Sequence, residues 1–195
     1  MSFYPENYPV PALLRTDEFI CRPLTTAHVE LDYAALMVSQ EMLQLWSGTS
    51  WPSADFTLEQ NWEDLEMHDQ EHQERVAFTY TVLTPDETEC LGCIYIKPLT
   101  DYMALNPETL TDVPSDAAVV GFWVKQPRLA DHLDERLLAA LRPWFEQAWS
   151  FSAVYFSTRN INKQQVQLLE ATNMLQQYTI TVPRRADKFF LYQAI

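Results

Sequence analysis

The sequence predicts an α/β protein built on a mixed β-sheet of six to seven strands, with helices on both faces. Its 195 residues are 47% apolar, which is enough for one sizeable core. Segments of strand-like and helix-like periodicity follow the order β-α-α-β-β-β-α-β-α-β-β. The apolar run Ala117–Val124 also leads into a segment of helical length, Asp131–Trp149, and a strand with a covering helix is the unit of such sheets. We therefore expect a single domain over residues 1–195.

In the first half of the chain, short apolar runs alternate with two segments of helical period. Residues 1–14 contain three prolines and two tyrosines, which predict an extended leader packed by its aromatic side chains. The predicted elements after this leader are a strand at Phe19–Leu24, a helix at Ala27–Met42, a loop at Trp46–Phe56, a helix at Thr57–Glu74, a strand at Arg75–Thr84 and a strand at Cys90–Leu99. A turn of Thr, Pro and Asp joins the last two strands into a hairpin.

The second half of the chain follows a long polar loop at residues 100–116. Its predicted elements are a strand at Ala117–Val124, a helix at Asp131–Trp149, a strand at Ala153–Thr158, a helix from about Asn162 to Thr172, and strands at Tyr178–Val182 and Phe189–Tyr192. Two parallel strands joined by a helix place a ligand crevice at their carboxyl ends. We therefore expect any chemistry near residues 122–134 and 158–165.

Composition excludes several classes of function. Three glycines are too few for a P-loop, a dinucleotide-binding turn or a nucleophile elbow. The net charge of −14 would repel a phosphate backbone, so we expect no nucleic-acid partner. The charge is uneven, because residues 1–149 carry −17 and the remainder carries +3. This basic C-terminal region either favours a small anionic ligand or is ordinary solvated charge.

The sequence also predicts the cellular compartment of the protein. The first fourteen residues lack the basic and apolar regions of a secretion signal, and no apolar run approaches the roughly 18 residues of a membrane helix. An odd number of cysteines, three, fits a reducing compartment better than a disulfide framework. We expect a cytoplasmic monomer or homodimer with no membrane partner.

Two short motifs, taken with the order of elements, resemble the GNAT acyltransferase superfamily over Phe19–Ile195. The apolar run contains Gly121-Phe122-Trp123-Val124, and the branch that includes the ribosomal-protein alanine acetyltransferases commonly reads G-[YF]-W-[VL] there. That branch carries a second motif near its C-terminus, N-x-x-S-x-x-x-L-E-K-x-G-F. The positions of this motif map here onto Asn162, Gln165, Leu169, Glu170, Ala171, Asn173 and Met174. The Asn, Leu and Glu of the motif are kept.

The resemblance implies an N-acetyltransferase that moves an acetyl group from acetyl-CoA to an amine of a small molecule or peptide. In this family the strand 117–124 and the next strand diverge, pantetheine lies between them, and the following helix N-terminus holds the pyrophosphate. The matching positions are the expected cofactor-binding residues Phe122, Trp123, Val124, Lys125, Arg128, Ala130, Asp131, His132 and Asn162. A backbone N–H near Trp123 or Val124 is expected to polarise the thioester carbonyl. The candidate catalytic residues are Asp116 and Tyr102, which precede the strand.

The pyrophosphate-binding loop departs from the family pattern. The glycines of its G-x-G fall on Ala130 and His132, with Asp131 between them. Asp131 is a good helix N-cap, so we expect its carboxylate to bond the amides that otherwise bind phosphate. A carboxylate about 4 Å from a phosphate charge costs on the order of 4 kcal/mol, more than the roughly 2 kcal/mol that a helix end contributes at most. Inward-pointing Lys125, Arg128 or Arg136 would offset this cost.

These departures leave a second prediction open. The tyrosine that many GNAT enzymes use as a general acid is replaced by Leu169. The alternative to an acetyltransferase is therefore a catalytically silent GNAT-like domain that binds a small molecule or a protein partner.

Three further patterns have a structural explanation beside a functional one. His68 and His72 fit the H-x-x-E-H pattern of a zinc hydrolase, but they lie in an acidic stretch that reads as a solvated helix face. Cys90 and Cys93 are three apart on a strand and should point to opposite faces, so they are expected to be buried thiols without a shared role. Tryptophans of the loop after Trp46 either belong to the core or wall an acceptor pocket. No metal is expected.

Overall fold

The computed structural model describes residues 3–103, 105, 113–182 and 185–194. Its strands are β1 (Leu14–Arg15), β2 (Ile20–Pro23), β3 (Phe78–Leu83), β4 (Cys90–Pro98), β5 (Ala118–Val124), β6 (Val154–Arg159), β7 (Met174–Thr181) and β8 (Lys188–Ala194). Its helices are η1 (Thr26–His28), α1 (Val29–Val38), α2 (Gln40–Ser47), α3 (Leu58–Gln73), α4 (Leu99–Met103), α5 (Gln126–Leu129), α6 (Leu133–Ala148) and α7 (Lys163–Ala171). No helix in these ranges is long and apolar enough to cross a membrane.

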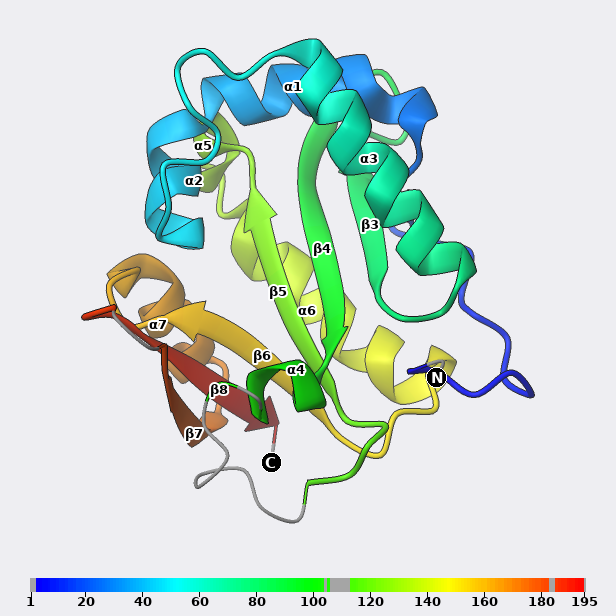
Figure 1. Ribbon diagram of the computed structural model, residues 1–195, viewed down its shortest axis with the longest axis vertical. Coiled ribbons are helices and arrows are strands. Elements are labelled where there is room, and N and C mark those ends of the chain that lie inside the picture. The colour runs from blue at the N-terminus through cyan, green and yellow to red at the C-terminus, as the bar shows by residue number, and fades with distance from the viewer. Residues whose placement is uncertain (1–2, 104, 106–112, 183–184, 195) are drawn as a thin grey trace.

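The strands form one mixed sheet in the order β1-β2-β3-β4-β5-β6-β8-β7 (Figure 1). Every neighbouring pair is antiparallel except β5 and β6, which are parallel and joined through α6. The predicted α/β class and mixed sheet are confirmed. The sheet has eight strands rather than six or seven, because Leu14 and Arg15 at the end of the leader pair with β2.

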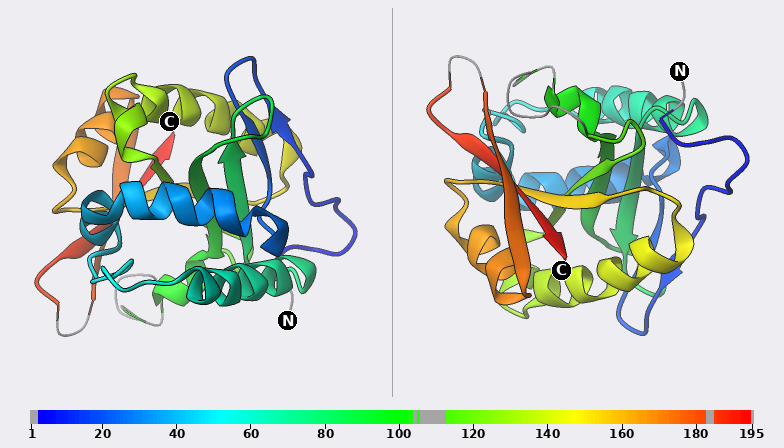
Figure 2. Two further views of the ribbon diagram at one scale, coloured as in Figure 1. Left: turned by 90° about the horizontal axis from the view of Figure 1, so that it is seen from above. Right: turned by 90° about the horizontal axis from the view of Figure 1, so that it is seen from below.

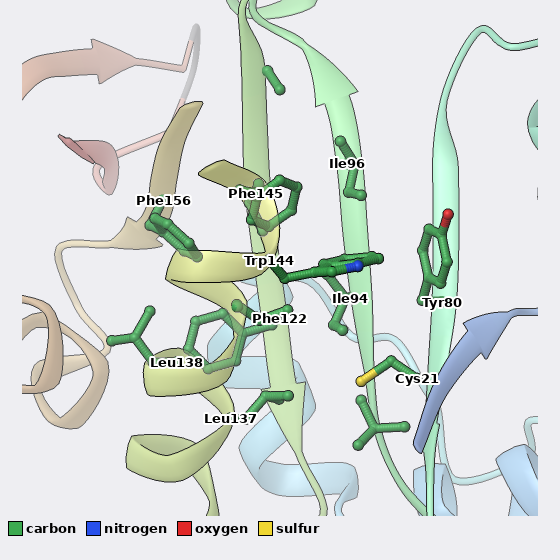
Figure 3. Packing of buried hydrophobic residues seen from close by; sticks show 14 of the residues in the cluster. Cys21, Tyr80, Ile94, Ile96, Phe122, Leu137, Leu138, Trp144, Phe145 and Phe156 are labelled. Atoms are coloured by element: carbon green, nitrogen blue, oxygen red, sulfur yellow. The ribbon is translucent and has the colours of Figure 1, made fainter. Parts of the chain in front are cut away.

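Helices cover both faces of the sheet, with α1 and α3 on one side and α6 on the other (Figures 1 and 2). The α6 side holds the largest core. There α6 turns Leu137, Leu138 and Trp144 toward side chains of β4 and β5 such as Ile94 and Phe122 (Figure 3). These α6 residues are buried because they recur at helical spacing on one face.

The opposite face of the sheet holds a second core. Leu36 of α1 and Leu65 of α3 pack there against Cys93 and Trp123 of the central strands. Neighbouring residues of a strand point to opposite faces. Trp123 therefore faces α1 and α3, whereas Phe122 and Val124 belong to the core under α6.

Two predicted segments differ in detail. The predicted helix Ala27–Met42 is divided into η1, α1 and α2, and it breaks at Ser39, whose buried hydroxyl accepts a hydrogen bond of 3.0 Å from the backbone N–H of Gln126. A serine side chain that hydrogen-bonds to a backbone group favours an interruption over a continuous helix. The predicted loop at residues 100–116 begins with α4, and its residues 104 and 106–112 lie outside the described part of the chain.

The leader is held by aromatic packing, as predicted. Tyr4 is fully buried, its ring centroid lies 5.2 Å from that of Trp149, and its hydroxyl accepts a 3.0 Å hydrogen bond from the Ser150 N–H. Tyr8 remains 42% exposed. A single tyrosine therefore anchors this segment to the end of α6.

The two close cysteines are buried as predicted, but the prediction that they point to opposite faces is wrong. Val82 pairs with Gly92, but the next residue, Leu83, pairs with Cys90, so Leu91 is an extra residue in β4. This β-bulge reverses the alternation of side chains at that point. Leu91 enters the core under α6, while Cys90 and Cys93 both join the core under α1.

Candidate active site at the divergence of β5 and β6

The two parallel strands separate part-way along their length (Figure 1). Their register covers Ala118 to Val120 on β5, and the last pair is Val120 with Phe156. Just beyond it, the Ser157 hydroxyl donates to the Val120 carbonyl oxygen at 3.3 Å. Residues 121–124 of β5 therefore have β4 on one side and no strand partner on the other, which is the divergence that the resemblance implied.

The free edge of β5 offers the backbone of Phe122 and Val124. The Lys125 N–H donates to Leu91 of β4 at 2.8 Å, and in an antiparallel ladder the bonded pairs recur at every second residue. The main chain of Trp123 therefore faces β4, while Phe122 and Val124 face the opening. Their N–H groups are candidate donors to a carbonyl oxygen held there.

Gln165 of α7 spans this opening. Its side-chain amide donates to the Phe122 carbonyl oxygen at 2.8 Å, and its oxygen accepts from the Thr158 hydroxyl at 2.9 Å. The N-cap residue of α7, Asn162, accepts from the Gln165 backbone N–H at 3.3 Å and so fixes the start of that helix. Gln165 thus links β5, β6 and α7 at the place where a pantetheine arm is expected.

The remaining space in the opening is small. A cavity of about 30 Å³ is bounded by Phe122, Val124, Asp134 and Gln165, with Trp46 of α2 on its other side. This is room for about one water molecule. An extended ligand would therefore require the Gln165 side chain to turn aside.

The N-terminus of α6 is not capped as the sequence suggested. The N-cap is His132, in the left-handed conformation at φ 56°, and Asp131 lies before it with its carboxylate 3.3 Å from Arg128 Nε. The prediction that Asp131 caps the helix is wrong. Asp134 in the first turn accepts from the Glu135 N–H at 3.1 Å. It is 8% exposed, and burial raises the pKa of its carboxyl.

The basic residues beside the opening already have acidic partners. Lys125 Nζ lies 2.9 Å from Glu89 Oε1, Arg128 pairs with Asp131, and Arg136 pairs with Glu18. Ala130 is exposed, and the His132 ring, 70% exposed, lies 2.8 Å from Glu135. In this structure Lys125, Arg128 and Arg136 are therefore engaged with carboxylates. They do not offset the repulsion between Asp131 and a phosphate.

A larger cavity of about 330 Å³ lies on the α1/α3 side of the same divergence. Gly121 of β5 and Ser157 of β6 form its floor. Its walls are mainly aromatic: Trp46, Trp51, Tyr95, Tyr102 and Phe189. Trp46 borders both this cavity and the smaller one, so the two cavities are neighbours. Trp46 and Trp51 thus line a cavity as predicted, although Trp46 belongs to α2 rather than to a loop.

Helix α3 supplies the acid–base groups of this cavity. His68 Nδ1 lies 3.0 Å from Glu71 Oε2, and the His68 ring stands edge-on to Tyr95 with centroids 5.6 Å apart. The hydrogen bond from His68 lowers the pKa of Glu71. A carboxylate at Nδ1 favours a proton on that nitrogen and leaves the Nε2 lone pair available as a base.

Asp64 lies one helical turn before His68 on the cavity wall. Burial raises its pKa, and a hydrogen bond from the Trp51 side chain opposes that shift. Within the described residues, no lysine or arginine forms an ion pair with Asp64. The carboxylate is therefore suited to hold a cationic group.

The two predicted catalytic residues lie in different places. Tyr102 lines the large cavity, hydrogen-bonds with Ser157, and has its pKa raised to about 12 by burial. Asp116 lies before the paired end of β5, borders a different cavity, and accepts a 2.7 Å hydrogen bond from Ser152. Only Tyr102 is thus placed at the divergence.

The two histidines of α3 have different surroundings. His68 borders the large cavity, whereas the His72 ring packs edge-on against Phe78 at 5.1 Å. Burial lowers the pKa of His72. The arrangement favours separate roles for the two rings over the zinc-hydrolase pattern.

The far wall of the large cavity carries Arg159. Its guanidinium forms an ion pair with Asp187, donates to the Ser47 carbonyl oxygen at 3.1 Å, and lies 4.8 Å from the centroid of the Phe189 ring. Arg159 is 2% exposed. Its charge is thus balanced within the protein, and it serves to join β6, β8 and the end of α2.

Comparisons with known proteins identify the fold. No protein-family model matches the sequence, and no curated protein matches it. Among solved structures, the ribosomal-protein-S5-alanine acetyltransferase of Vibrio fischeri superposes with a TM-score of 0.71 at 15% identity, over 95% of this chain and 97% of that one. This chain has the GNAT fold.

Two other structures with the GNAT fold were solved with ligands. RimL, a ribosomal L7/L12 α-N-protein acetyltransferase in complex with coenzyme A, matches with a TM-score of 0.71 at 14% identity, over 94% of this chain and 97% of that one. The microcin C7 self-immunity acetyltransferase MccE, in complex with acetyl-CoA and AMP, matches with a TM-score of 0.70 at 11% identity. The match covers 95% of this chain and 98% of that one. The structural neighbours thus include the branch that the motifs resembled.

Three residues central to the site were missed by sequence reasoning. Gln165 was noted only as a motif position, His68 only as half of a metal pattern, and Asp134 was not singled out. Each belongs to the site through contacts with a different element. For His68 the signal was available, since Glu71 follows it by three residues on a predicted helix.

Proposed function

We propose that this protein transfers an acetyl or related acyl group from an acyl-CoA to an amine. The observation that carries the proposal is the divergence of β5 and β6 after Val120. It leaves the β5 edge at Phe122 and Val124 without a partner among the described strands, beside the cavity of about 30 Å³ and next to the cavity of about 330 Å³. The neighbouring GNAT acetyltransferases support the same reaction class.

Two sets of groups in this chain suit the chemical steps. The N–H groups of Phe122 and Val124 would stabilise negative charge on the thioester oxygen. His68 would accept a proton from the attacking amine through Nε2, while Glu71 stabilises the imidazolium. A C–N bond forms, the C–S bond breaks, and the thiolate leaves and takes up a proton as free coenzyme A.

The cavity favours a compact amine with an apolar or aromatic body. Its aromatic walls offer stacking surface, and a cation beside an indole or phenol ring gains about 0.5–2 kcal/mol. Asp64 adds a carboxylate without a cationic partner among the described residues. An ammonium group held by Asp64 and the tryptophans is therefore the favoured acceptor before it loses its proton.

The test measures thiol release from acetyl-CoA with a panel of amines that includes 2-phenylethylamine, and coenzyme A binding by calorimetry. We expect turnover with aromatic amines and a loss of roughly 100-fold in kcat for His68→Gln, the scale of a general base. Glu66→Gln, a change at an exposed position of the same helix, is the matched control. Coenzyme A that fails to bind at millimolar concentration would instead indicate the silent domain.

A further inference from the structure

Two cysteines and one aspartate meet in the core beneath α1. Asp32 of α1 and Cys90 and Cys93 of β4 are 3%, 1% and 0% exposed. One carboxylate oxygen and the two sulfurs lie within 4.8 Å of one another. The cluster lies outside the two cavities at the divergence of β5 and β6.

The β-bulge at Leu91 is the feature that creates this cluster. In a regular strand, Cys90 and Cys93 would face opposite sides of the sheet. The extra residue turns both thiols toward α1, where Cys93 Sγ donates to Asp32 Oδ1 at 3.3 Å. Bulges re-aim side chains in this way near functional sites.

The charge balance of Asp32 is incomplete. Its second oxygen accepts a 3.1 Å hydrogen bond from the Asn61 side chain, so its two hydrogen-bonding partners are an amide and a thiol. Within the described residues, neither lysine nor arginine forms an ion pair with it. Buried carboxylates are usually paired with a cation or bound to a metal.

We propose that Asp32, Cys90 and Cys93 form a buried binding site for a thiophilic divalent cation of the zinc type. Two thiolates and a carboxylate are a donor set that zinc accepts in tetrahedral geometry, with Zn–S distances of about 2.3 Å and Zn–O distances of about 2.1 Å. Such distances place neighbouring donors roughly 3.5–4 Å apart, so the side chains need to close by about 1 Å or less.

Binding exchanges protons for the metal. Each thiol loses its proton to water as its sulfur binds the cation, and the carboxylate binds in its charged form. The fourth ligand would be a water molecule, or the Asn61 amide oxygen if this side chain, which now donates its N–H to Asp32, turns over. The bound cation would tie α1 to the β3–β4 hairpin and thereby fix the helix that covers this face of the sheet.

The experiment adds one equivalent of Co²⁺, and separately Zn²⁺, to the full chain purified in reductant and stripped of metal. We expect the thiolate-to-cobalt absorption bands of a tetrahedral site, saturation at one ion per chain, and a rise in melting temperature with Zn²⁺ that a chelator reverses. Wild-type protein without these bands and without the thermal shift would overturn the proposal.

Matched variants locate the site. Asp32→Asn, Cys90→Ser and Cys93→Ser should each weaken cobalt binding at least 10-fold, whereas Cys21→Ser, which removes the buried cysteine of the opposite core, should leave it unchanged. Equal binding by wild type and Asp32→Asn would contradict the assignment even if a cysteine variant fails to fold. In protein purified without reductant, a count of one free thiol instead of three after denaturation would point to a Cys90–Cys93 disulfide and also overturn it.

Discussion

Gly92 and Gly121 show how differently two glycines of one sheet are constrained. A methyl group added at Gly92 would lie 2.1 Å from the Trp123 carbonyl oxygen, a backbone atom that cannot turn aside. At Gly121 the nearest atoms are Trp46 Cζ2 at 3.4 Å and Ser157 Oγ at 3.5 Å, which is ordinary contact. Gly92 is therefore required by the approach of β5, while Gly121 leaves room at the floor of the large cavity.

We predict that Gly92→Ala lowers the free energy of unfolding by about 1–3 kcal/mol, because the strands must move apart to accept the methyl group. Urea denaturation, monitored by circular dichroism, measures the free energy of unfolding of each variant. Gly121→Ala is the control and should change stability by less than about 1 kcal/mol. Equal losses in the two variants would contradict the steric argument.

Asp134 gives a second prediction at the residue scale, which concerns how the stability of the protein depends on pH. Burial raises its folded-state pKa above the ordinary value of 3.8, so the folded protein holds this proton to higher pH than the unfolded chain. Its contribution to stability therefore falls as pH rises from about 3.8 through the folded-state pKa. Asp134→Asn should be more stable than wild type at neutral pH, with the difference vanishing near pH 3.

Thermal denaturation across pH tests this prediction. The asparagine oxygen can still accept the hydrogen bond from the Glu135 N–H, so the helix start is preserved. Asp131→Asn serves as the control, because it makes the same change at a side chain that is 59% exposed. A gain in stability for Asp134→Asn that is the same at all pH values would show that the charge of Asp134 is not its cause.

At the scale of elements, β5, β6 and α7 meet through the side chain of Gln165. The strands part after Val120, and the Gln165 amide bonds the Phe122 carbonyl oxygen that the separation leaves free. A buried carbonyl without a partner costs about 1–3 kcal/mol. The same contact therefore stabilises the divergent strands and occupies the expected place of pantetheine.

We predict that Gln165→Ala lowers stability by about 1–3 kcal/mol and tightens coenzyme A binding, because the opening is cleared. Calorimetric titration and urea denaturation give the two values. Gln167→Ala, at an exposed position of the same helix, should change neither. Weaker coenzyme A binding by Gln165→Ala would show that the amide assists the ligand rather than competing with it.

At the scale of the whole molecule, charge works against an anionic cosubstrate. The chain carries −14, coenzyme A is itself a polyanion, and the cations beside α6 are paired with acidic residues. Salt shortens the range of such repulsion from roughly 30 Å at 0.01 M to about 8 Å at 0.15 M.

Coenzyme A affinity should therefore rise, by a few-fold, as sodium chloride is increased over this range. Titration calorimetry at constant pH measures the trend, and uncharged sucrose at matched osmolarity is the control. Binding that weakens steadily with salt would mean that Lys125, Arg128 or Arg136 leaves its acidic partner to contact phosphate.

The order of the main strands and helices could be predicted, because apolar periods of two and 3.6 residues are local properties of the sequence. The capping box of α3, in which Thr57 and Gln60 each bond the other's backbone N–H, is equally local. The predicted element boundaries were wrong where a residue contacts a partner far away in the sequence. Ser39 breaks a predicted helix because it meets Gln126, and residues 14–15 form a strand because β2 lies beside them.

The sequence by itself was enough to predict the GNAT fold, through the succession of elements and the motifs on β5 and α7, and the same resemblance implied where a site would lie. Only the tertiary structure decided which side chains fill that neighbourhood. Gln165 reaches β5 across the parted strands, His68 enters the cavity from α3, and a one-residue bulge gathers two thiols around Asp32. These contacts join residues far apart in the chain, and the register and packing that create them are set by the whole core rather than by any local pattern.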